Sequence, residues 1–134
     1  MSVEEEYMDV LQSIESTIIR TYREHRNVTD YDVLRAFEVL VDDYSGEKIG
    51  RAPRVVRLSE TERVLIDSIR TICDWRLGRP NTLVDESGQP IASPRPITVD
   101  EVIMCLKRLV KSAKMWDKEG GQRGYLDFIA QYIV

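Results

Sequence analysis

Histidine and cysteine are scarce: the 134 residues include one histidine and two cysteines. Cys73 and Cys105 are separated by 31 residues and His25 lies far from both, so the set matches no zinc finger and no disulfide framework. Both thiols are expected to be reduced and buried within helices. His25 falls in the last turn of an expected helix, where packing or interaction with the helix dipole is the ordinary role. The sequence therefore predicts no cofactor.

Long apolar runs are also missing. The longest candidate, residues 129–134, is interrupted by Gln131 and is much too short to span a bilayer. The first residues, MSVEEE, are acidic and lack the basic region and apolar core of a signal peptide. We therefore expect a cytoplasmic protein without membrane contact.

A recognisable phosphate-binding loop is absent as well. The segment Gly120–Gly124 precedes an expected helix, so its backbone N–H groups and Arg123 offer a site for an anion. Its spacing matches neither the P-loop nor the dinucleotide fingerprint, and no strand precedes it. The glycines are better explained as the end of one helix and the turn into the next.

Charge is present in both signs but is unevenly placed. The net charge is −4, and residues 1–50 carry 12 acids and 5 bases, whereas residues 51–134 carry 11 acids and 14 bases. Such a split favours pairing of the two halves within one chain or between chains. It disfavours nucleic acid as the main partner, because no strong overall positive field would hold phosphates.

Three helix-start signatures establish the fold class. Each pairs a hydroxyl residue with a carboxylate three positions later and precedes apolar residues at helical spacing: Thr29 with Asp32, Ser59 with Glu62, and Thr98 with Glu101. They predict one all-α domain over residues 1–134, a compact bundle of four longer helices and a short one at the C-terminus. The expected ranges are about 4–25, from Thr29 to Ser45–Gly46, 60–77, 99–118 and 123–133.

A long proline-containing loop is expected over residues 78–97. Gly78 should stop the preceding helix, and the loop contains Pro80, Pro90, Pro94 and Pro96. Segments 82–84 and 89–91 flank the turn-forming residues 85–88 and predict a small hairpin. Loops of this length in compact domains are often functional, although a surface insertion without a role explains the stretch equally well.

Apolar side chains on the wrong face of helices are the main functional clue. Trp75 projects away from the expected core stripe of its helix, and the last helix is apolar nearly all round, with Tyr125, Phe128 and Tyr132 among its residues. A second subunit or a partner protein would cover such surfaces, and aromatic anchors are enriched at interfaces. The alternative is a monomer in which the last helix is central and Trp75 is covered by the 78–97 loop.

A basic stripe is predicted on the helix at 99–118. Lys107, Lys111, Lys114 and Lys118 follow one another at spacings of 4, 3 and 4, which aligns them along one flank. An acidic partner or a nucleic acid would fit the stripe, with Arg51, Arg54 and Arg57 as additional contacts. A solvated face is the simpler interpretation, since no aromatic platform accompanies the lysines.

Glu38, Asp42 and Asp43 are the candidates for a divalent-metal site, because hard cations prefer oxygen ligands. They lack the paired E-x-x-E spacing that helical metal-dependent hydrolases show, and Glu38 and Asp42 flank the core stripe instead of facing inward. An ordinary charged surface, with Glu38 and Asp42 available to pair with the lysine stripe, explains them better.

The leading functional hypothesis is a non-enzymatic, self-associating protein-interaction or regulatory module, most simply a homodimer, with Trp75, Tyr125, Phe128 and Tyr132 as anchors. A divalent-metal-dependent hydrolase and a nucleic-acid-binding module are the alternatives. The sequence identifies no catalytic residue, ligand or pathway.

Overall fold

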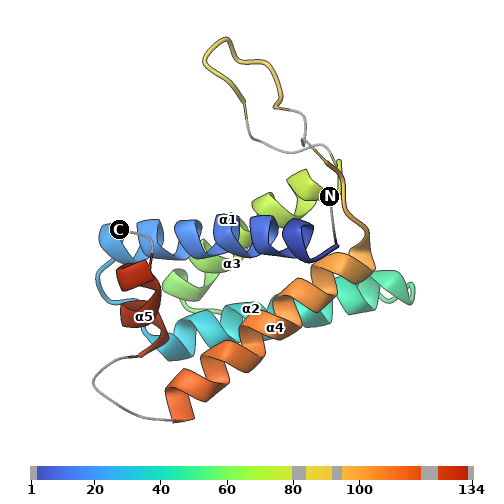
Figure 1. Cartoon of the computed structure of the whole chain (residues 1–134). Coiled ribbons are helices and arrows are strands. Elements are labelled where there is room, and N and C mark those ends of the chain that lie inside the picture. The colour runs from blue at the N-terminus through green and yellow to red at the C-terminus, as the bar shows by residue number, and fades with distance from the viewer. Residues whose placement is uncertain (1–2, 80–83, 92–94, 119–123, 133–134) are drawn as a thin grey trace.

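The computed structural model describes residues 3–79, 84–91, 95–118 and 124–132, and for residues 3, 4, 118 and 132 it describes the backbone alone. Over these residues the chain is all-α, as the sequence predicts (Figure 1). The helices are α1 (Val3–Glu24), α2 (Asp30–Lys48), α3 (Glu60–Arg76), α4 (Val99–Lys118) and α5 (Tyr125–Tyr132). None of these described helices combines the length and the apolar character needed to cross a bilayer.

The predicted capping residues begin α2, α3 and α4. The hydroxyls of Thr29, Ser59 and Thr98 each accept a hydrogen bond from the backbone N–H three positions later, at 3.3, 3.1 and 3.2 Å. At α2 the exchange is reciprocal, because the Asp32 carboxylate accepts from the Thr29 N–H at 3.0 Å. Each bond satisfies a donor that the first turn of a helix leaves open, and the three predicted starts are confirmed.

Glycines with positive φ end α2 and α3. Gly78 directly follows Leu77, the C-cap residue of α3, and has φ 72°, as predicted. The predicted end of the second helix at Ser45–Gly46 is wrong, because α2 continues to Lys48 and the left-handed position is taken by Gly50, with φ 78°. The Arg51 N–H then donates to the Gly46 carbonyl at 2.7 Å. One interior glycine costs a helix only about 1 kcal/mol, which the buried packing of α2 offsets.

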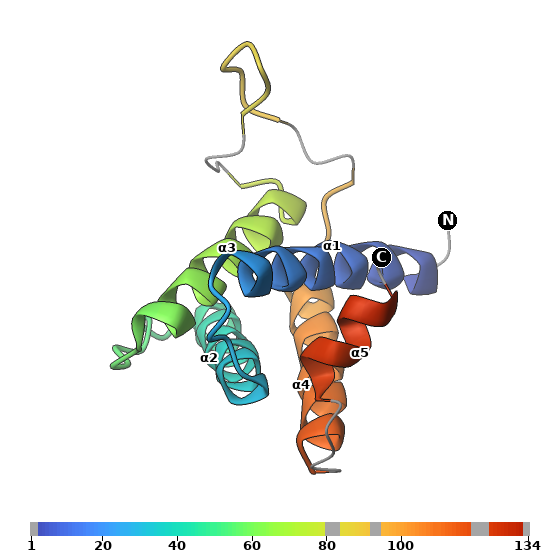
Figure 2. The same cartoon turned by 90° about the vertical axis from the view of Figure 1, so that its left-hand side faces the viewer.

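The helices bury one apolar core between them. α2 lies between α3 and α4 and contacts both, while α1 crosses the bundle and contacts α3, α4 and α5 (Figures 1 and 2). Fully buried side chains come from all five helices: Ile14, Ile18, Phe37, Leu40, Leu65, Ile69, Leu106, Tyr125 and Ile129. This core holds the helices whose outer faces carry the candidate sites.

The two cysteines lie in this core, as the sequence predicts. Cys73 and Cys105 are both free and fully buried, and desolvation raises the pKa of both thiols, that of Cys105 to about 11. Of the two roles expected for His25, packing is wrong, because the side chain is exposed. The residue does lie at the C-terminal end of α1, one residue beyond the helix, and its backbone N–H donates to the Thr21 carbonyl at 2.8 Å.

Residues 84–91 form an arm that projects from the helical body in both views (Figures 1 and 2). Within the described part of the predicted hairpin, Val84 and Pro90 form an isolated antiparallel bridge, and the Asp85 N–H donates to the Gln89 carbonyl at 2.9 Å. Gly88 supplies the positive φ of the turn, 83°. The arm is therefore a preformed turn that lies outside the helical core.

Candidate interaction surfaces

Tyr125 lies in the core. Its side chain is 1% exposed, and its ring meets the ring of Phe37 edge to face, with centroids 6.3 Å apart and planes at 84°. Burial also raises the pKa of its hydroxyl. Tyr125 is therefore not a surface anchor of this chain, contrary to the expectation from sequence, because α5 turns this side of its apolar surface toward α1 and α2.

Phe128, by contrast, lies on the outside of α5. It is 39% exposed and stacks on the half-buried ring of Trp116 in α4, with centroids 4.5 Å apart and planes at 24°. Met115, next to Trp116 in sequence, is 55% exposed. Together Met115, Trp116 and Phe128 form what we call the α4–α5 patch.

Sequence reasoning missed Trp116. The available signal was its position on the helical stripe of Leu109 and Ala113, at spacings of 4 and 3, which places it at the edge of the buried face. The helix that covers this edge is determined by tertiary packing, so the stack of Trp116 on Phe128 could not be predicted from the sequence.

Trp75 belongs to a different surface. It lies in the last turn of α3, half-buried, and its indole N–H donates to the Ile91 carbonyl of the arm at 3.1 Å. Both views separate the C-terminal end of α3 from α5 (Figures 1 and 2). The structure therefore does not bring Trp75 and Phe128 together, and the side chain of Tyr132 lies outside the described residues.

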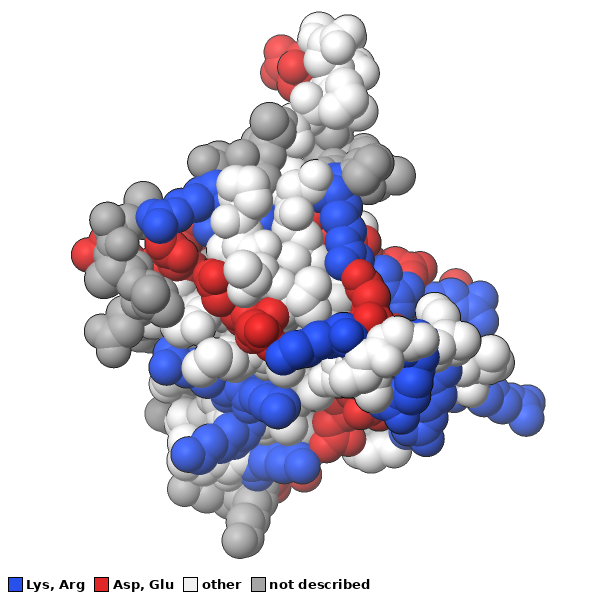
Figure 3. Space-filling model, turned by 90° about the vertical axis from the view of Figure 1, so that its right-hand side faces the viewer, with Lys and Arg blue, Asp and Glu red and all other residues white. Residues whose placement is uncertain are grey.

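The basic stripe is exposed on α4 where it is described. Lys107, Lys111 and Lys114 are all exposed, and Lys114 forms an ion pair with Glu38 of α2 at 3.2 Å, as one of our expectations had it. The guanidinium of Arg108 lies over the ring of Tyr7, 5.0 Å from its centroid. The side chain of Lys118 lies outside the described residues. Figure 3 shows basic side chains gathered in groups over the lower part of one face, with acidic ones between them.

The metal candidates are each engaged by a different cation. Glu38 pairs with Lys114, Asp42 with Arg54 at 3.1 Å, and Asp43 with Arg70 at 2.5 Å. Within the described ranges, no group of three or more His, Cys, Asp or Glu side chains lies close enough to hold a metal ion. These contacts favour the charged-surface interpretation of the three acids over a metal centre.

A charged groove lies where α2 and α3 meet the connector that follows α2. Two adjoining hollows, of about 340 and 350 Å³, share Asp43, Arg51 and Pro53 in their walls. The charges in those walls balance, since four acids stand against four arginines: Asp42, Asp43, Glu47 and Asp74 with Arg51, Arg54, Arg70 and Arg79. The described walls of the groove thus carry no net charge.

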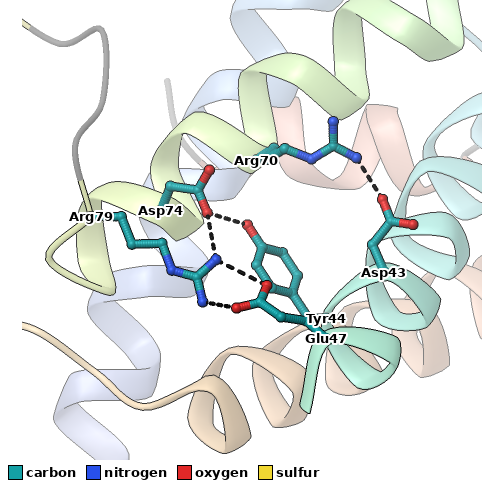
Figure 4. Close-up of polar contacts among 6 residues, drawn as sticks. All are labelled: Asp43, Tyr44, Glu47, Arg70, Asp74 and Arg79. Atoms are coloured by element: carbon teal, nitrogen blue, oxygen red, sulfur yellow. Dashed lines mark hydrogen bonds and ion pairs between the residues drawn. The ribbon is translucent and has the colours of Figure 1, made fainter. Parts of the chain in front are cut away.

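Most of these charges pair within the groove (Figure 4). The Tyr44 hydroxyl donates to Asp74 at 2.9 Å, and Arg79 reaches Asp74 at 3.6 Å and both carboxylate oxygens of Glu47. The hydrogen bonds to Glu47 raise the pKa of Arg79. The network ties the end of α2 to the end of α3, which is a structural role.

Replacing Tyr44 with phenylalanine tests that role. We expect Tyr44→Phe to lower the free energy of unfolding by about 1 kcal/mol at neutral pH, because one hydrogen bond is lost while Asp74 keeps Arg79. Burial raises the pKa of Tyr44 in the folded chain, so its contribution is complete below about pH 10 and is lost as the pH rises further. Urea denaturation at neutral pH and above pH 10 measures this effect. The free energy of unfolding should fall less at high pH in the variant than in the wild type, and equal decreases would contradict the role assigned to Tyr44.

The chain was also compared with known proteins. No protein-family model matches it, and neither the curated proteins nor the solved structures contain a significant match.

Proposed function

We propose that this chain is a small, non-enzymatic protein-interaction module that self-associates through the α4–α5 patch. The observation that supports the proposal most directly is the stacked pair of Phe128 and Trp116, which is partly exposed beside Met115. Large aromatic side chains with low rotamer entropy are the usual energetic centres of interfaces. A dimer with a two-fold axis would make the contact twice, so that each copy covers the patch of the other.

The remaining chemistry of the described residues agrees with this role. The acids that could have held a metal are paired with basic side chains, and the charged groove where α2 and α3 meet has equal numbers of acidic and basic residues in its walls. The two free, buried thiols fit a reducing compartment, so we include a cytoplasmic location in the proposal.

The test is the oligomeric state of Phe128→Asp, measured by sedimentation equilibrium over a range of concentrations. We expect a dimer for the wild type and at least about a tenfold weaker association for the variant, because a charge would be buried in the contact. Phe128 is 39% exposed in the single chain, so the variant should keep the wild-type helical circular dichroism.

Ile49→Asp is the matched control. Ile49 is 66% exposed at the end of α2, and the same change of an apolar residue to aspartate there should leave the dimer intact. A wild type that is monomeric at every concentration, or a Phe128→Asp variant that associates as well as Ile49→Asp, would reject the proposal.

A further inference from the structure

The arm at residues 84–91 is ordered by its own turn. The Asp85 carboxylate accepts hydrogen bonds from the Ser87 N–H at 2.9 Å, the Ser87 hydroxyl at 2.6 Å and the Gln89 N–H at 3.0 Å. The bridge between Val84 and Pro90 and the positive φ of Gly88 complete the turn. At its base, Trp75 donates to the Ile91 carbonyl. A docking element held this way loses little conformational entropy when it binds.

The surface of the arm is both apolar and acidic. All eight residues are exposed, including Val84 at 54% and Ile91 at 40%. The segment contains two acids, Asp85 and Glu86, and no base. The carboxylate of Asp85 accepts the hydrogen bonds of the turn, whereas Glu86 forms no ion pair with any described residue. The arm thus presents apolar side chains beside a negative charge.

The outer face of α4 has the complementary character. Between Met104 and Met115 the sequence contains four bases and no acid, and the two methionines are 48% and 55% exposed. Lys107 and Lys111 are exposed and form no ion pair within the described part of the chain. This face offers apolar contacts and two uncompensated positive charges in one row, which we call the α4 basic face.

We propose that the arm of one copy docks on the α4 basic face of a second copy, with Glu86 near Lys107 and Lys111. The inference rests on the self-association proposed above and names the element that completes it. The arm does not lie on this face in its own chain, because it projects from the helical body in the direction opposite to that in which α4 runs, in both views (Figures 1 and 2). Two copies related by a two-fold axis exchange arms and close the assembly.

The geometric test is a zero-length carbodiimide cross-link between carboxylate and amine in an equal mixture of ¹⁵N-labelled and unlabelled full-length protein. We expect peptides that join Glu86 to Lys107 or Lys111, with one partner heavy and the other light. Mixed labels show that the link is between copies. If Lys107 and Lys111 link only to carboxylates other than those of the arm, the inference is overturned.

The energetic test is a charge exchange. Glu86→Lys and Lys111→Glu should each weaken the dimer about tenfold, and the double variant should recover most of that loss. Glu86 lies outside the hydrogen bonds of the turn, so its replacement leaves the arm folded. Glu24→Lys, an exposed acid at the end of α1, is the matched control and should not change the dimer.

The outcomes separate the inference from the proposal on which it rests. If Phe128→Asp is monomeric while Glu86→Lys dimerises like the wild type and no arm cross-link forms, the chain self-associates without its arm and the inference is wrong. If neither variant affects a stable dimer, both are wrong. Weakening by Glu86→Lys with recovery in the double variant supports the inference, and weakening by Phe128→Asp supports the proposal on which it rests.

Discussion

Replacing Phe37 with alanine should lower the free energy of unfolding by about 3–5 kcal/mol, the largest loss that we expect from a single substitution in this chain. Phe37 is 0% exposed on α2, the helix that lies between α3 and α4. Its ring also makes the edge-to-face contact with Tyr125, so truncation removes the aromatic partner that fixes α5 against the bundle. The cavity left behind adds to the loss because helices on several sides cannot all close on it.

Urea denaturation followed by circular dichroism measures this effect. Phe37→Leu is the appropriate control, because it keeps most of the buried volume and should cost less than about 1.5 kcal/mol. A loss below about 1 kcal/mol in Phe37→Ala would show that the site collapses freely, which is not expected for a residue of α2 that packs against α5 in a close-packed core.

The helix starts were predictable because their causes are local. Thr29 and Ser59 each bond to the backbone three residues away, so the pattern is complete within a few positions of the sequence. The end of α2 was not predictable in the same way, because Gly46 and Gly50 both satisfy the local signal for a stop. The choice of Gly50 follows from the buried packing of the last turn of α2, which includes Tyr44 and Gly46.

The candidate site was predictable only in part, for a related reason. The periodicity showed that α5 is apolar on several faces, but it could not say which face the bundle covers. The structure buries Tyr125 and leaves Phe128 partly exposed, and it supplies Trp116 from another helix as the partner of Phe128. Assignments of this kind require the relative placement of helices that are far apart in sequence.

The N-terminus of α5 shows the same dependence on distant residues. The residue before the helix is Gly124, which has no side chain with which to cap it. The cap comes from α2 instead: the Asp30 carboxylate accepts from the N–H of Tyr125 at 2.9 Å and from that of Leu126 at 3.0 Å. A negative charge at this end of a helix is also favoured by the helix dipole.

Asp30→Ala should therefore cost about 2–3 kcal/mol of unfolding free energy, since two charge-assisted hydrogen bonds that join α2 to α5 are lost. Asp30→Asn keeps the shape and one acceptor oxygen, so its cost should be about half as large. Hydrogen exchange should become faster at the amides of Tyr125 and Leu126, which the carboxylate protects.

Gly124→Ala should reproduce the loss while Asp30 itself is kept. A Cβ added at Gly124 would lie 1.8 Å from Oδ2 and 2.7 Å from Cγ of Asp30, so the carboxylate must leave the N-terminus of α5. The double variant Asp30→Ala/Gly124→Ala should then be no less stable than Asp30→Ala alone, because the added methyl group meets no carboxylate. Additive losses in the double variant would show that the two residues act separately, and that Gly124 is needed for the backbone rather than for the approach of Asp30.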